Sequence, residues 1–260
     1  MQKNLLYFPE FGAFILGLLP AWWLQWQAAD LIWSLWLSSL TLGYLTIFAT
    51  VAGGAYVGVA VLSHPQFPSD KKGIAIFFGV MAGLFFLGFF SLHFGGFHAG
   101  HASFLQNFFP LPQATMSTFS AGFMNPFVLW NAAVDYVLPF YGWFLLPMLI
   151  VERHAIFKAF AQCLGLAARI KDSDDFETGD IAKWRKRQRD KTAAGTAKAK
   201  STMNSFLFQP YTNVVKMHCM IFVLAGCQIL RLDNFLVYCI ISAVYFFPWR
   251  VFRKRQMKEC

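Results

Sequence analysis

Residues 73–101 read GIAIFFGVMAGLFFLGFFSLHFGGFHAGH and contain no acidic residue, lysine or arginine. About 20 mainly apolar residues are enough for a helix to cross the ~30 Å hydrocarbon core of a bilayer. Lys71 and Lys72 stand directly before the stretch, and such basic residues are typical of the cytoplasmic end of a membrane span. We therefore predict a transmembrane helix here.

Further apolar stretches of similar character lie on both sides of this one. The sequence predicts six membrane spans, at residues 8–26, 31–62, 73–101, 127–151, 209–230 and 234–249. Pro139 and Pro147 lie inside the fourth span, and we expect them to kink it, because proline is tolerated but disruptive in membrane helices. The expected fold class is all-α, a polytopic bundle of transmembrane helices.

The overall composition agrees with a membrane protein. The chain of 260 residues is 57% hydrophobic and only 13% charged, whereas an ordinary soluble domain has about 25% charged residues. This balance excludes a disordered chain, a coiled coil, a disulfide scaffold and a typical soluble enzyme. The net charge of +9 fits basic cytoplasmic loops better than a nucleic-acid partner.

The placement of lysine and arginine predicts the orientation of the spans. If both termini face the cytoplasm, that side holds almost all of the basic residues outside the spans, and the opposite side holds Arg231 alone. This is the asymmetry that the positive-inside rule describes. We therefore expect a multi-pass protein of the plasma (inner) membrane, with residues 27–30, 102–126 and 231–233 facing outward.

Three regions follow from this topology. Residues 1–163 hold the first four spans, with an external segment at 102–126 that is either a hairpin or a re-entrant segment. Residues 164–205 form a charged cytoplasmic loop, and residues 206–260 hold the last two spans and a basic tail. Within the loop, the basic stretch 183–200 is either a contact with anionic lipid or a solvated linker.

Small residues recur four apart in the second and third spans. Such pairs let two helix backbones approach closely. We interpret them first as contacts within the chain, and as a homo-oligomer or partner interface second. The pairs are Ala49 and Gly53, Gly54 and Gly58, Gly79 and Gly83, and Gly96 and Gly100.

The third span carries an unusual group of histidines near its outer end, namely His93, His98 and His101. Ionisable side chains inside a span are costly and usually face a bundle interior or a water-filled cavity. On a helix His98 and His101 lie one turn apart, and His218 in the fifth span is the expected partner from a second helix.

Three interpretations of these four histidines stay open. They bind a transition metal (copper, zinc or iron) or haem, for which imidazole is a suitable ligand. Alternatively they relay a proton or substrate, or they only form structural hydrogen bonds. Asp135 is the only acid well inside a predicted span. It is either a partner that orients an imidazole or takes part in a relay, or an interfacial residue.

The same residues carry a family resemblance. The pattern His93-Phe94-Gly95-x-Phe97-x-x-x-His101, followed much later by Tyr211 and His218, resembles an uncharacterised bacterial family of polytopic membrane proteins, a domain of unknown function. The resemblance singles out His93, His101 and His218 and makes His98 incidental. It implies no activity, and the long charged loop is not part of its pattern.

Three functional hypotheses result. The first is a metal- or haem-binding membrane protein with a redox or metal-handling role. The second is a proton-coupled transporter or channel that uses the histidines and Asp135. The third is a non-catalytic membrane subunit of a larger complex. Whether the protein is an enzyme stays open.

Overall fold

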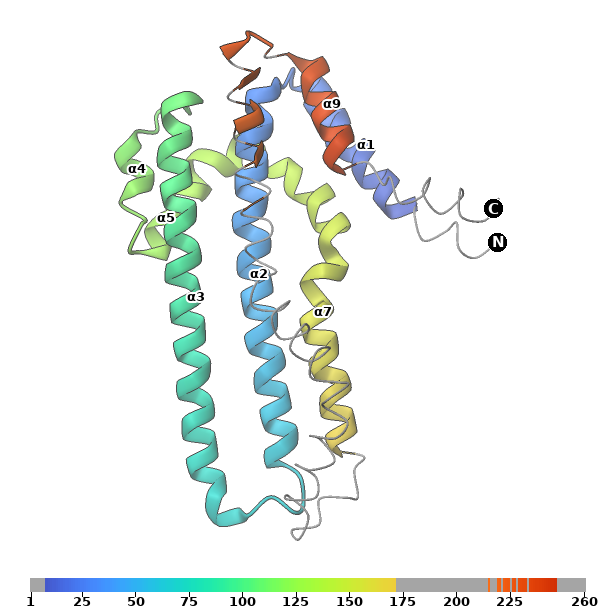
Figure 1. The fold of residues 1–260 in the computed structure, drawn as a ribbon, viewed down its shortest axis with the longest axis vertical. Coiled ribbons are helices and arrows are strands. Elements are labelled where there is room, and N and C mark those ends of the chain that lie inside the picture. Colours follow the sequence, from blue (N-terminus) through green and yellow to red (C-terminus); the bar gives the residue numbers. More distant parts are fainter. Residues whose placement is uncertain are drawn as a thin grey trace. The chain divides into compact units, whose positions relative to one another are not determined.

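The structure, a computed structural model, describes residues 8–171, 215, 219–220, 222–224, 226–227, 229–232 and 234–246. This part of the chain is helical and contains no strand, which confirms the predicted all-α class (Figure 1). Three of its helices are long and apolar enough to cross a membrane, namely Asp30–Leu62, Ser69–Phe108 and Pro126–Arg153.

Helices α1 (Phe8–Trp23) and α2 (Ala28–Leu62) correspond to the first two predicted spans. The chain turns sharply between them at Gln25, whose φ of 56° lies in the left-handed region. The carboxylate of Asp30, in the first turn of α2, accepts a hydrogen bond from the backbone N–H of Gln27 at 2.7 Å. Acidic groups at this position also interact favourably with the helix dipole.

Helix α3 (Lys72–Phe108) follows a short 3₁₀ turn, η2 (Ser69–Lys71). It continues to Phe108, two turns beyond the expected end of the third span at His101. Residues 102–108 contain neither glycine nor proline, and only Pro110, which has no N–H to donate, stops the helix. At 1.5 Å per residue, α3 is about 55 Å long, which exceeds the ~30 Å core of a bilayer.

The segment after α3 folds back along it. It contains α4 (Met116–Ser120) and leads to α5 (Pro126–Ala132). The amide of Gln106 holds the turn, since Nε2 donates to the carbonyl of Ala114 at 2.7 Å and Oε1 accepts from the N–H of Leu111 at 3.0 Å. A Cβ added to Gly96 would lie 3.1 Å from the carbonyl oxygen of Phe123, so the returning chain contacts α3 closely.

The fourth predicted span is helical but irregular. After α5 come a π-helix η3 (Ala133–Val137), α6 (Leu138–Tyr141), a 3₁₀ turn η4 (Gly142–Phe144) and α7 (Leu145–Lys171). In an α-helix the ring of Pro139 would clash with the carbonyl of Asp135, four residues earlier. The π-turn widens the helix at that carbonyl, so the regular helix is interrupted beside Pro139, whereas Pro147 lies in the first turn of α7.

The remaining predictions are tested only in part. Helix α9 (Phe235–Phe246) lies within the sixth predicted span, whereas most of the fifth span lies outside the described residues. Helix α7 continues to Lys171, beyond the expected start of the charged loop at 164, and residues 172–205 are not described.

The chain divides into two compact units. The first unit comprises residues 1–42, 92–154 and 214–260, and the second comprises residues 43–91 and 155–213. Most of the fully buried large side chains belong to the first unit. Those of lowest exposure include Trp33, Trp36, Phe94, Phe119 and Tyr238.

Candidate functional site

His98, on α3 in the first unit, is completely buried. Its Nδ1 lies 3.0 Å from the carbonyl oxygen of Phe94, one turn earlier, and its Nε2 lies 3.1 Å from the hydroxyl of Ser39 on α2. A carbonyl oxygen can only accept, so Nδ1 carries the proton. In the neutral ring Nε2 then accepts from Ser39, and no lone pair of His98 is left for a metal.

Aromatic side chains surround the imidazole of His98. Trp36 lies with its ring centroid 6.2 Å away, and Phe94 packs at 4.3 Å. The indole N–H of Trp36 donates to the carbonyl of His98 at 3.0 Å, which ties α2 to α3 a second time. Phe119 of α4 covers Trp36 at 5.8 Å. The packing is that of a closed core.

The other two histidines of the cluster have different surroundings. His93 is exposed, and the edge of its ring meets Phe97 at 5.0 Å between centroids. His101 is half-buried, with its ring 6.1 Å from that of His98. The three histidines of α3 therefore lie in three environments, exposed, buried and half-buried, and the buried one is the histidine that the resemblance made incidental.

The proposed partner from the fifth span, His218, lies outside the described residues. Within the described part of the chain, no three side chains of His, Cys, Asp and Glu lie where they could hold one metal ion. A shared site of His93, His101 and His218 therefore stays a prediction. The expected lipid contact at 183–200 also falls outside the described residues.

Asp135 lies in the π-turn η3 and is exposed. It belongs to the irregular helical segment that corresponds to the fourth predicted span, and its role as a partner of a histidine or in a relay stays a prediction. Among the described residues, no hydrogen bond joins the carboxylate of Asp135 to a histidine. π-Turns are frequent at functional sites, but this one has a structural cause in Pro139.

A different acid, Asp30, makes a long-range contact that the sequence did not predict. The carboxylate of Asp30 accepts a hydrogen bond at 3.0 Å from the phenol of Tyr141, which is 111 residues away in the chain. Trp26 packs against Tyr141, with ring centroids 5.6 Å apart, and against Tyr238 at 6.3 Å. These contacts join the start of α2 to α6 and α9 within the first unit.

Comparison with known families places the chain in a wider group. Residues 12–146 match a family of unknown function (DUF6498), and the chain belongs to this family. The match runs from α1 to the start of α7 and includes the histidines of α3, while residues 147–260 lie beyond it. Searches of curated proteins and of solved structures found no match.

Proposed function

We propose that this protein is a non-catalytic membrane subunit that associates through the hairpin of α2 and α3. The observation that carries the proposal is the exposure of α3. Among residues 72–93, all of which are described, none is buried. Large side chains such as Phe77, Phe78 and Phe85 are each more than 60% exposed. Contiguous apolar surface of this kind is typical of membrane or protein contacts.

The glycines of α2 and α3 indicate that part of this apolar surface contacts protein and not only lipid. Gly53 packs within the second unit, because a Cβ there would lie 2.9 Å from Sγ of Cys163 on α7. No described residue would lie within 4 Å of a Cβ added to Gly54, Gly58, Gly79 or Gly83. Contacts within the chain, which were our first interpretation of the small-residue pairs, therefore explain Gly53, Gly96 and Gly100. The pairs Gly54/Gly58 and Gly79/Gly83, called the open pairs below, are left for a contact with another partner.

The two open pairs lie at a similar depth in the hairpin. Gly54 and Gly58 are about 6–12 Å from the end of α2, and Gly79 and Gly83 are about 10–17 Å from the start of α3, at 1.5 Å per residue. Tyr44 of α2 donates to the carbonyl of Ser91 at 2.9 Å, so the two helices are tied within the second unit. Glycine costs about 1 kcal/mol in a helix, which a close helix contact offsets.

The partner that fits is a second copy of the chain. A small-xxx-small face is self-complementary, since two copies of one helix can bring the same residues together, and two-fold symmetric dimers are the commonest oligomers. Each subunit then covers the open glycines of the other. The rest of the exposed apolar surface faces lipid.

Self-association in vesicles tests this proposal. Donor- and acceptor-labelled copies of the full chain in phosphatidylcholine vesicles should show energy transfer that falls on dilution with lipid. Gly79→Ile or Gly83→Ile should raise the dimer dissociation constant about tenfold, equivalent to ~1.4 kcal/mol. Gly73→Ile is the matched control, because a Cβ at Gly73 also has no described residue within 4 Å. Transfer that is absent in the wild type, or equally reduced in the control, would overturn the proposal.

The topology around this hairpin is part of the same proposal. We infer six spans in the plasma membrane with both termini in the cytoplasm. Three long apolar helices and the shorter apolar helix Phe11–Trp23 support the count, and α9 supports the last span. The distribution of Lys and Arg supports the orientation.

The metal and transport hypotheses stay predictions of the sequence. No contact of the described residues favours either, because the buried His98 uses both of its nitrogens within the protein. Element-resolved metal analysis of the purified full chain tests the metal hypothesis. Stoichiometric metal that is lost in His93→Ala and in His218→Ala would establish the shared site, whereas metal retained in both variants would exclude it.

A further inference from the structure

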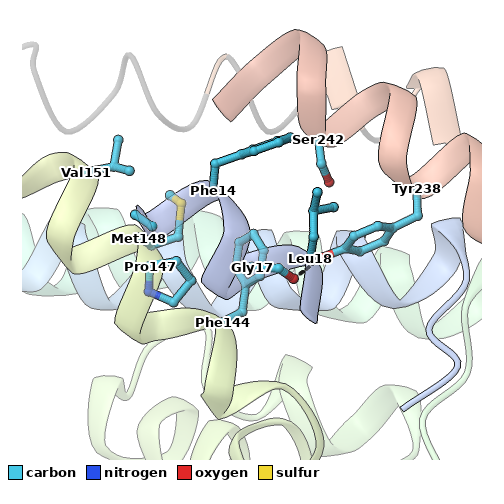
Figure 2. Close-up of a pocket in the computed structure, with 10 residues that line it drawn as sticks. Phe14, Gly17, Leu18, Phe144, Pro147, Met148, Val151, Tyr238 and Ser242 are labelled. Atoms are coloured by element: carbon cyan, nitrogen blue, oxygen red, sulfur yellow. Dashed lines mark hydrogen bonds between the residues drawn. The ribbon is translucent and has the colours of Figure 1, made fainter. Parts of the chain in front are cut away.

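Among the described residues, the interior of the first unit leaves little room for a ligand. The cavity between α1, α9 and the start of α7 has a volume of about 20 Å³, which is room for a single water molecule. Apolar side chains line it, among them Phe14, Phe144 and Met148 (Figure 2). A larger partner therefore binds this unit at its surface, and the hairpin that joins α3 to α5, residues 104–127, has an unusual surface.

The hairpin carries no acidic residue, lysine or arginine. These four residue types are absent from the whole stretch between Lys72 and Asp135. An ordinary soluble segment has about 25% charged residues, so a loop of this length that stands in water would have about six. A long stretch without charge is instead typical of chain that lies in a membrane.

Large apolar side chains are exposed on the hairpin. Phe123, Met124 and Phe127 are 54%, 76% and 80% exposed. On α3 the exposed aromatic side chains continue from the apolar stretch to Phe104 and Phe108, whose ring centroids lie 4.7 Å apart. The hairpin therefore extends the apolar surface that the membrane-spanning part of α3 exposes, and surface of this kind is typical of a membrane contact.

The polar groups of the turn are paired within the protein. Pro110 has no N–H, and the N–H of Leu111 donates to Oε1 of Gln106 at 3.0 Å. The indole N–H of Trp33 donates to the carbonyl of Phe109 at 2.8 Å. Irregular backbone is tolerated at membrane depth where its polar groups are paired inside the protein, so this turn is suited to a bilayer.

The length of α3 determines the depth of the hairpin. A bilayer with its headgroup layers is about 40–45 Å thick, and spans tilt by up to about 40°. At a tilt of about 35–40°, α3, which is about 55 Å long, reaches from one headgroup layer to the other. A Cβ at Gly96 or Gly100 would lie 3.1 Å from the carbonyl oxygen or 3.9 Å from the ring of Phe123. Phe123 is thus about 12–18 Å along α3 from its end at Phe108, at the edge of the hydrocarbon core.

We propose that this hairpin is immersed in the bilayer leaflet at the C-terminal end of α3, with Phe123, Met124 and Phe127 in contact with acyl chains. Phe104 and Phe108 lie nearer to the headgroups. Lipid is the partner that fits, because the surface continues that of a membrane-spanning helix and no charged residue interrupts it. The identity of this leaflet as the outer one rests on the proposed topology, whereas the depth of the hairpin does not.

Oxidation of methionine by hydroxyl radicals tests the proposal on the full chain. These radicals form in water and oxidise the methionine side chains that water reaches. In phosphatidylcholine vesicles, Met124 should be oxidised about tenfold more slowly than a methionine peptide dissolved in the same suspension. Met81, 49% exposed in the apolar stretch of α3, is the reference for a methionine covered in the membrane. Asn107→Met is the matched control, because Asn107 is exposed in the last turn of α3, and its methionine should be oxidised about threefold faster than Met124.

A phosphatidylcholine with a diazirine in its acyl chain distinguishes lipid from protein as the cover of Met124. It should label residues 123–127, which mass spectrometry of the peptides locates. Gly79→Ile, which weakens the proposed dimer, should change neither this labelling nor the oxidation of Met124, so the two proposals can fail separately. Oxidation of Met124 as fast as that of the Asn107→Met side chain would place the hairpin in water. That result, or protection of Met124 without any lipid label, would overturn the proposal.

Discussion

At the scale of single residues, the contact between His98 and Ser39 carries the clearest energetic expectation. Nε2 of His98 is buried and has the hydroxyl of Ser39 within 3.1 Å. Removing that hydroxyl leaves a buried acceptor without its partner. Hydrogen bonds between membrane helices average only about 0.6 kcal/mol, and an unsatisfied buried group adds about 1 kcal/mol or more.

We therefore expect Ser39→Ala to lower the free energy of unfolding by about 1–2 kcal/mol. Ser34→Ala is the matched control, because Ser34 is also buried on the same helix and, among the described residues, its hydroxyl bonds only to the carbonyl of Asp30 in α2 itself. It should change stability by less than about 0.5 kcal/mol. Denaturant unfolding in bicelles measures both. Equal losses of unfolding free energy in the two variants would show that the bond to His98 contributes no more to stability than the local bond of Ser34.

The sequence identified the histidine cluster but ranked its members differently from the structure. His93, His98 and His101 lie on a helix that is apolar on nearly every side, so no periodicity indicates which face is buried. The buried face depends on Ser39 and Trp36 of another helix and on Phe119 of a third. Contacts between distant segments of this kind are not contained in local spacing.

At the scale of helices, the π-turn η3 is the feature with the most specific cause. A π-turn holds one more residue than the α-helical turn it replaces. Closing it to an α-helix would drive the ring of Pro139 against the carbonyl of Asp135. The sequence predicted a kink because Pro139 was visible in an apolar span, but the site of the distortion is the turn before it.

This explanation predicts how the helix responds to a deletion. Deleting Val134, which is 49% exposed in the π-turn, should cost about 3 kcal/mol or more in the wild type, because the proline then sits inside a regular helix. In the Pro139→Ala background the same deletion should cost less than about 1 kcal/mol, because alanine fits an α-helix. Denaturant unfolding measures both costs. Pro147→Ala is the control background, and a rescue there as well would refute the assignment to Pro139.

The neighbouring glycines of α2 allow a second test at this scale. A Cβ at Gly53 would come within 3.4 Å of Cα of Phe160 and 2.9 Å of Sγ of Cys163, whereas one at Gly54 has no atom of the described part of the chain within 4 Å. Gly53→Ala should therefore destabilise the fold by about 1–3 kcal/mol through overpacking. In the monomeric chain, at a low ratio of protein to bicelle, Gly54→Ala should be neutral or stabilise the fold by up to about 1 kcal/mol, from helix propensity. The same bicelle unfolding assay compares them, and an equal effect would contradict the packing of Gly53 on α7.

At the scale of the whole molecule, three hydrogen bonds between distant helices lie within the residues that match the family. The matched residues 12–146 contain the hydrogen bonds from Trp33 to Phe109, from Trp36 to His98 and from Tyr141 to Asp30. These bonds join α2 to α3 and to α6 inside the first unit. The same compact unit continues beyond the match, since it also includes residues 147–154 and α9.

The orientation of the chain is the last property that the sequence predicts, and trypsin is well suited to test it. Lysine and arginine abound between residues 183 and 200, whereas residues 102–126 contain neither. The exposed Arg231 is the basic residue expected on the outer side.

Trypsin added to vesicles with the cytoplasmic face outward should cut within 183–200, because that loop carries the positive charge that stays in the cytoplasm. Added to the opposite face it should leave the loop intact and reach only Arg231, which electrophoresis and mass spectrometry of the fragments would show. Detergent-solubilised protein, cut from either side, is the control for accessibility. Cleavage within 183–200 from the outer face would reverse the orientation.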